Sequence, residues 1–155
     1  LRGKLIPSAL VTHRTQYEAT VRAVWLMYAA TDNHVAKLTA ELSLEAEQAA
    51  KNLPSTNEMI QALGAKAPPA ALQPLRDFKQ YSWSALNSYV HSGIHALKRQ
   101  ETGYPVQLLE QCLKQSNAIA IVASMQAAIL TGNQQLVKQV GALQQKYQYC
   151  LPPAL

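Results

Sequence analysis

The sequence predicts an all-α protein, an antiparallel bundle of about five helices formed as one domain over residues 1–155. Apolar residues recur at spacings of three, four and seven along most of the chain, which is the periodicity of a helix face. No stretch shows the alternation of a strand, and the few β-branched residues also fall at helical spacing. Most prolines lie between the periodic stretches, where they interrupt helices.

Charged residues make up 15% of the chain, against about 25% in an average globular protein. Helices with so few charges must have much of their surface covered, in a core or in an oligomer interface. The net charge is +5, but the basic residues are scattered and form no stripe that could follow a phosphate backbone. Nucleic-acid binding is therefore allowed by the charge without being required.

The first helix is predicted over residues 8–30, with Pro7 and Ser8 as its start signals. The helical pattern breaks at residues 31–33, where Thr31 or Asp32 is expected to cap the N-terminus of the next helix. A second helix then runs as far as Pro54. One short helix follows in NEMIQAL, and GAKAPPA is a loop.

A further helical region covers residues 71–99, where Ser82 separates a short helix from a longer one. A long helix then runs from Val106 to Gly132, and the last helix covers residues 133–149. One side of the last helix is apolar: Leu136, Val140, Leu143 and Tyr147.

Two cysteines without CxxC spacing, Cys112 and Cys150, predict reduced thiols in a cytoplasmic protein. The most apolar run, residues 118–130, is too short to span a membrane and is typical of a buried helix. The chain begins with Leu1 rather than Met, so we expect residues to precede it, and LRGKLIPS lacks the continuous apolar region of a secretory signal.

The first helix carries three charged residues at i, i+4 and i+8: Arg14, Glu18 and Arg22. Because the rest of this helix is apolar on nearly every side, we expect it to be central and these charges to be partly buried. Burying ions costs several kcal/mol each unless they pair, and the spacing lets Glu18 accept from both arginines. The line indicates a functional cleft, a structural network or a subunit seam.

The stretch SALNSYVHSGIHALKR adds a second polar line on the helix over residues 71–99. At about 100° per residue, five side chains share one stripe: Ser84, Ser88, His91, His95 and Arg99. A separate apolar stripe is predicted to face the core: Trp83, Leu86, Val90, Ile94 and Leu97. The polar stripe faces solvent, a partner subunit or another helix.

If the two polar lines face each other, they form a pocket with a carboxylate beside imidazoles. Glu18 would orient His91 or His95, raise its pKa and help it act as an acid or base. An anion would be held by the arginines of the two lines: Arg14, Arg22 and Arg99.

A metal site is the weaker alternative for these residues. His91 and His95 could share a metal with Glu18 as the third ligand. The zinc-protease signature requires glutamate where Ser92 stands, and the arginines disfavour a cation. No metal or cofactor is predicted, since the chain has no Gly-rich phosphate loop, nucleophile elbow or dinucleotide fingerprint.

Several other residues favour structural roles. His13 and His34 are expected to be exposed near the ends of the first helix, and Asn117 is expected to hydrogen-bond inside the bundle. Gly93 would permit a close helix approach. Aromatic residues at helical spacing are more typical of a core than of base stacking: Trp25, Tyr28, Trp83 and Tyr89.

The stretches HRTQYEATVRAVWLMYAATD and YVHSGIHALKR resemble a group of uncharacterised bacterial domains in which an Arg-Glu-Arg helix precedes a His-Gly helix. More loosely, the chain is similar to HEPN proteins, helical bundles that often dimerise and of which many are RNases in toxin–antitoxin and phage-defence systems. HEPN nucleases place a histidine four to six residues after an arginine on one helix. Here His91 and His95 precede Arg99, so the resemblance supports the bundle more than the cleavage of RNA.

The resemblance implies a cytoplasmic, HEPN-like homodimer. If the protein is an enzyme, metal-independent RNA cleavage is expected, with His91, His95 and Glu18 as the catalytic residues. One alternative is a non-catalytic interaction or antitoxin-type module whose charged lines fix helix register or form the subunit seam. The other is a small-anion or nucleotide sensor. The expected partners are a second copy, RNA or another protein, and no membrane.

Overall fold

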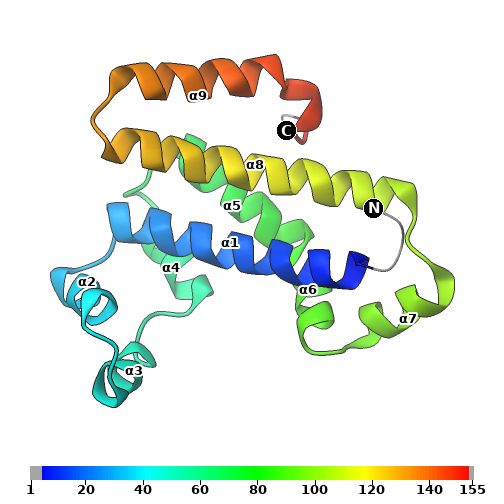
Figure 1. The fold of residues 1–155 in the computed structure, drawn as a ribbon, viewed down its shortest axis with the longest axis horizontal. Coiled ribbons are helices and arrows are strands. Elements are labelled where there is room, and N and C mark those ends of the chain that lie inside the picture. The colour runs from blue at the N-terminus through cyan, green and yellow to red at the C-terminus, as the bar shows by residue number, and fades with distance from the viewer. Residues whose placement is uncertain (1–4, 154–155) are drawn as a thin grey trace.

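The computed structural model describes residues 5–153, and this range is helical and contains no strand (Figure 1). The prediction of an all-α protein is confirmed. None of the helices in this range is long and apolar enough to cross a membrane. The helices are α1 (Ile6–Tyr28), α2 (Asp32–Thr39), α3 (Leu44–Ala50), α4 (Thr56–Leu63), α5 (Pro69–Tyr81), α6 (Trp83–Val90), α7 (Ile94–Thr102), α8 (Val106–Leu130) and α9 (Gln134–Lys146), followed by the 3₁₀ turn η1 (Gln148–Cys150).

Two layers of helices enclose the core. Figure 1 shows α1, α8 and α9 side by side in a front layer, with α4, α5 and α6 behind it. α2 and α3 extend from one end of the molecule, and α7 lies at the other. α1 and α8 run in the same direction, which strict up-and-down alternation would not give, whereas α9 returns antiparallel to α8 after a short turn. The predicted antiparallel bundle of about five helices is therefore not confirmed.

α1 supplies the centre of the core, as its apolar periodicity predicts. Tyr17 and Val21 are fully buried and Trp25 is nearly so. The Tyr17 ring stacks on Phe78 of α5 with 4.2 Å between ring centroids, and its hydroxyl donates to the Leu75 carbonyl at 3.0 Å. This hydrogen bond satisfies a hydroxyl that would otherwise be buried at a cost in free energy.

The helix predicted over residues 31–53 is interrupted and forms α2 and α3. Thr31 caps α2 as expected, but the chain leaves the helix at Ala40, and the Leu42 side chain is 96% exposed. Ser43 then begins α3, its hydroxyl accepting a hydrogen bond from the backbone N–H of Ala46 at 3.1 Å. Since Leu42 projects into solvent, no tertiary packing supports a continuous helix here.

The helix predicted over residues 71–99 is divided twice. Ser82 separates α5 from α6 as expected, and its hydroxyl donates to Gln115 of α8 at 2.5 Å. A second break, which the periodicity did not predict, falls just after α6. There Ser92 adopts a left-handed φ of 53°, and a Cβ on Gly93 would lie 2.5 Å from the Ser88 hydroxyl oxygen. The close approach expected at Gly93 is therefore made to the preceding helix, in a turn that redirects the chain into α7.

This turn changes which residues face the core. Leu86 of α6 is buried, but Val90, Ile94 and Leu97 are 39%, 68% and 63% exposed. The predicted apolar stripe through α6 and α7 is wrong beyond Leu86, because the two helices do not share one axis. α7 buries none of its residues, and it packs mainly on α6.

Candidate functional site

The charged line on α1 is only partly assembled. Arg14 Nη2 donates to Glu18 Oε1 at 3.0 Å, and Arg14 Cζ lies 4.6 Å from the ring centroid of Trp83 at the start of α6. The Arg14 side chain is 13% exposed and that of Glu18 is 37% exposed. Arg14 Nε and Nη1 are buried without a hydrogen-bond partner among the described residues. One ion pair and one cation–π contact therefore hold this guanidinium.

Arg22 lies one helical turn after Glu18 in α1 and is exposed. Within residues 5–153, Glu18 forms its ion pair with Arg14 and not with Arg22. The prediction that Glu18 accepts from both arginines is therefore wrong. An ion pair in solvent gains little, whereas Arg14 is held in place by Trp83.

The two histidines are separated by the unpredicted turn. His91 follows α6 as its C-cap and His95 lies in the first turn of α7, and both are exposed. In the described part of the chain neither forms a hydrogen bond or ion pair with Glu18. Trp83, which contacts Arg14, begins α6, and His91 lies eight residues further on, about 12 Å along the helix axis.

The predicted polar stripe on one helix is therefore wrong, and the structure does not bring the two charged lines together. Arg99, the last member of the stripe, is half-buried near the end of α7.

The residues predicted as alternative metal ligands do not form a metal site either. Across residues 5–153 no group of three or more His, Cys, Asp or Glu side chains could hold a metal ion, so the set of Glu18, His91 and His95 is not assembled. Cys112 and Cys150 are both free, as expected, and burial raises the pKa of the Cys112 thiol.

His13 was expected to be exposed and is instead buried, with 6% of its surface accessible. Its ring meets Phe78 edge-on at 4.9 Å between centroids. Burial lowers the pKa of His13 to about 4, so the imidazole is neutral at pH 7. The prediction failed because α1 begins at Ile6, which places His13 two turns inside the helix and four residues before Tyr17, on the same buried side.

Two further side chains have structural roles. His34 was also expected to be exposed but is half-buried; it completes the capping box of α2 with Thr31, and its ring centroid lies 4.9 Å from that of Trp25. Asn117 donates from Nδ2 to the Cys150 carbonyl at 3.0 Å, which ties η1 to α8. The structural role predicted for Asn117 is confirmed.

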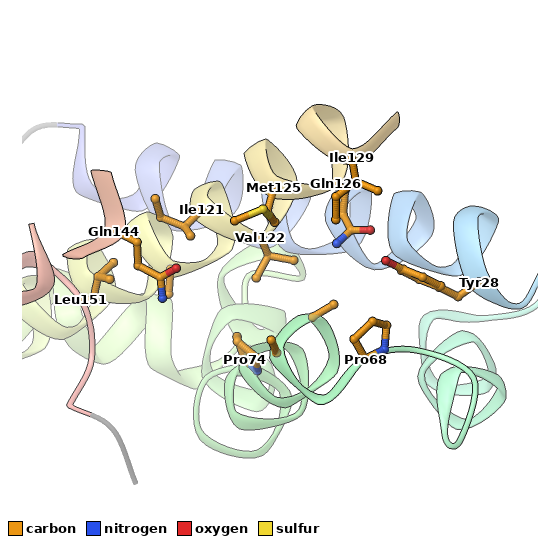
Figure 2. A pocket seen from close by; sticks show the side chains of 13 residues that line it. Tyr28, Pro68, Pro74, Ile121, Val122, Met125, Gln126, Ile129, Gln144 and Leu151 are labelled. Carbon is orange, nitrogen blue, oxygen red and sulfur yellow. The ribbon is translucent and has the colours of Figure 1, made fainter. Parts of the chain in front are cut away.

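A groove of about 190 Å³ lies where α5 faces α8 and the end of the chain (Figure 2). Its walls are mostly apolar, with Pro74 on one side and Val122 and Met125 on the other. Gln126 lies toward one end, close to Tyr28; it is 5% exposed, and its Oε1 is buried without a hydrogen-bond partner among the described residues. The sequence offered one signal of this groove, an amide within the apolar run over residues 118–130.

The front layer also presents a broad surface on the side turned away from α4, α5 and α6 (Figure 1), which we call the outer face. On α1 and α8 its positions lie on the side away from buried residues such as Tyr17 and Ile119. The outer face consists of exposed side chains from the three helices of the front layer: Thr12, Ala19, Ala23, Leu113, Ala120, Ala127, Leu136, Leu143 and Tyr147.

Comparison with known proteins identifies a family but no activity. The model of a family described as "Family of unknown function (DUF6988)" matches residues 1–153. No curated protein and no solved structure matches the chain.

Proposed function

The chain belongs to this family of unknown function, and we propose that it is a non-catalytic, self-associating module whose subunit interface is the outer face. The observation that carries the proposal is that two long helices expose a side with almost no charge.

Few charged residues lie on the outer face, and the nearest is Lys146 of α9, whose Nζ lies 5.2 Å from the ring centroid of Tyr147. In α8 the two charged residues, Glu110 and Lys114, pair with each other at 2.8 Å near the start of the helix. On α1 the Arg14–Glu18 pair is turned toward α6, and Arg22 lies at the edge of the face. A helix side that remains in water ordinarily carries charged residues. The composition of this side is therefore that of a covered surface.

The outer face is large enough for a stable interface. α1 and α8 contain 23 and 25 residues, and α9 adds a third, shorter row. At about 1.5 Å per residue and about 10 Å between helix axes, the face measures roughly 700–900 Å². A standard protein interface buries about 800 Å² on each partner.

A second copy of this chain is the partner that the face fits. In a two-fold symmetric contact the same surface meets itself, so it must not repel its own copy. The chain carries a net charge of +5, but only Arg22 and Lys146 lie at the edges of the outer face, so most of that charge is away from the contact. The alanines at positions 19, 23, 120 and 127 also permit two helix layers to approach closely.

The test is to place a charge at the centre of the face. We expect sedimentation equilibrium to give twice the 17.0 kDa chain mass for the wild type and the monomer mass for Ala120→Arg, with the same helical circular dichroism. Ala36→Arg, a matched change at an exposed alanine of α2, should remain dimeric. A monomeric wild type at the highest attainable concentration, or an Ala120→Arg variant that still dimerises, would overturn the proposal.

The HEPN-type RNase function has less support, because the charged pair on α1 and the two exposed histidines lie apart. The catalytic roles of His91, His95 and Glu18 stay predictions, as do cytoplasmic placement and a role in toxin or phage-defence systems. The same is true of the anion-binding residues that a sensor would use: Arg14, Arg22 and Arg99. An antitoxin-type module that binds another protein would use the same outer face, and the mass measurement distinguishes it from a homodimer.

A further inference from the structure

We propose that the groove between α5 and α8 binds a small aromatic molecule that carries one N–H or O–H donor and has about the size of indole. This inference does not depend on self-association, because the groove lies on the side of α8 turned toward α5 and the outer face lies on the other side.

The size and lining of the groove set the size and polarity of the ligand. An apolar cavity of about 150 Å³ is large enough to bind benzene. The groove provides about 190 Å³, which is room for a ring system slightly larger than benzene. Val122, Ile129 and Leu151 contribute apolar walls, so a charged ligand would lose its hydration without compensation.

Gln126 supplies the polar contact. Its side chain is almost completely buried, and its Oε1 has no hydrogen-bond partner in the described chain. Figure 2 shows the amide between Tyr28 and the middle of the groove, with the nitrogen toward the groove and the oxygen toward Tyr28. Rotation about the last side-chain bond exchanges the two atoms, so the oxygen can accept a hydrogen bond from a molecule in the groove. An acceptor buried without a partner costs free energy, and after this rotation a donor on the ligand satisfies the oxygen, while the NH2 group faces Tyr28, whose hydroxyl oxygen can accept from it.

Pro74 adds a second acceptor at the same groove. Because proline has no N–H, the carbonyl of Ala70 lacks the donor that an α-helix would place four residues later. Ala70 and Pro74 both line the groove. Within the described chain, the Ala70 carbonyl and Gln126 Oε1 are therefore two acceptors without a partner at the groove, which favours a ligand with an N–H or O–H group.

The flanking side chains favour a flat ring. Pro68 and Pro74 lie along one side of the groove, and Met125 and Ile129 lie along the other (Figure 2). A methionine thioether makes favourable contacts with aromatic rings. A planar molecule between the proline rings and Met125 would contact both sides at once.

The experiment is a titration of the ¹⁵N-labelled protein with indole and, separately, with indene, which has the same shape but no N–H donor. We expect indole to shift the resonances of Ala71, Val122 and Met125 saturably, with a Kd on the order of 0.1–1 mM for a ligand of this size. Indene should bind several-fold more weakly. Ala118→Phe, which fills the groove, should abolish both titrations.

Two variants separate the amide from the apolar walls. Gln126→Leu should remove the preference for indole over indene, while Gln107→Leu, a matched change at an exposed position of the same helix, should keep it. No saturable shift with either ligand would overturn the proposed site. If indene bound the wild type as tightly as indole or more tightly, the proposed role of Gln126 would be overturned. This comparison uses only the wild-type protein, so it does not depend on whether a variant folds.

Discussion

The inner and outer sides of the front layer both carry few charges, yet they differ in what covers them. The inner side presents large residues, among them Tyr17, Trp25 and Ile119, which the second layer of the same chain buries. The outer side presents alanines such as Ala19 and Ala120 beside exposed leucines such as Leu113, and no helix of the described chain covers them. Apolar character on a helix thus reports that a surface is to be covered, but it does not report whether the same chain or another copy covers it.

The largest expected effect comes from breaking the inner side. Trp25→Ala should lower the free energy of unfolding by about 3–5 kcal/mol, because it removes a fully packed aromatic side chain from the core. Urea denaturation at low protein concentration measures this loss. Ala19→Ser, on the outer side of the same helix, should cost about 0.5 kcal/mol under the same conditions. Similar losses for the two variants would contradict the distinction between the sides.

A second effect on the inner side depends on pH. His13 titrates near 6.5 in the unfolded chain and at about 4 in the folded protein. The stability that this neutral imidazole contributes is therefore fully present above pH 6.5 and is lost as the pH falls toward 4. The loss should reach about 2–3 kcal/mol over this window.

The control for this prediction is His13→Leu, which cannot titrate at that position. Denaturation curves recorded from pH 7 to pH 4 should show a flatter pH dependence for this variant than for the wild type. Parallel pH profiles would mean that His13 becomes protonated in the folded state without penalty.

The ion pair at the edge of the front layer should contribute less. Glu18→Gln should cost about 1 kcal/mol, because the partly buried guanidinium of Arg14 loses its counter-charge but keeps its contact with Trp83. Arg22→Ala should change the unfolding free energy by less than about 0.5 kcal/mol. If Glu18→Gln and Arg22→Ala lowered the free energy of unfolding equally in thermal or urea denaturation, that result would support the three-residue network predicted from the sequence.

The smallest effects are expected at the exposed histidines. His91→Ala and His95→Ala should each change the free energy of unfolding by less than about 0.5 kcal/mol, since neither side chain is buried. The same variants test the catalytic roles in an RNA-cleavage assay. Cleavage by the wild type that either substitution abolishes, with stability unchanged, would contradict a non-catalytic function.

The sequence predicted the long helices better than the short ones for a physical reason. α1 and α8 have apolar residues on several turns, and a capping or proline signal marks each start. α7 has the same apolar spacing, but it follows a turn that a single left-handed Ser92 sets, and a local conformation of that kind leaves no periodic signal. The apolar residues Ile94 and Leu97 consequently face solvent rather than the core.

The candidate sites were less predictable than the fold. Charge spacing identified the Arg14–Glu18 pair, because residues four apart on one helix always meet. The distance between this pair and His91 depends on how α1 and α6 pack, which spacing within one helix does not encode. The groove at Gln126 combines residues from α1, α5, α8 and α9, so its shape follows from tertiary packing, and the sequence signals it only by one amide in an apolar run.

The most direct test of the central claim is alanine-methyl NMR of the wild-type protein over a dilution series from millimolar to micromolar concentration. We predict that the methyl resonances of Ala19, Ala23, Ala120 and Ala127 shift together on dilution as the dimer dissociates. Ala36, exposed on α2, should not shift. If the four outer-face methyl resonances stay constant while that of Ala36 moves, or if the protein is monomeric throughout, the outer face is not a subunit interface.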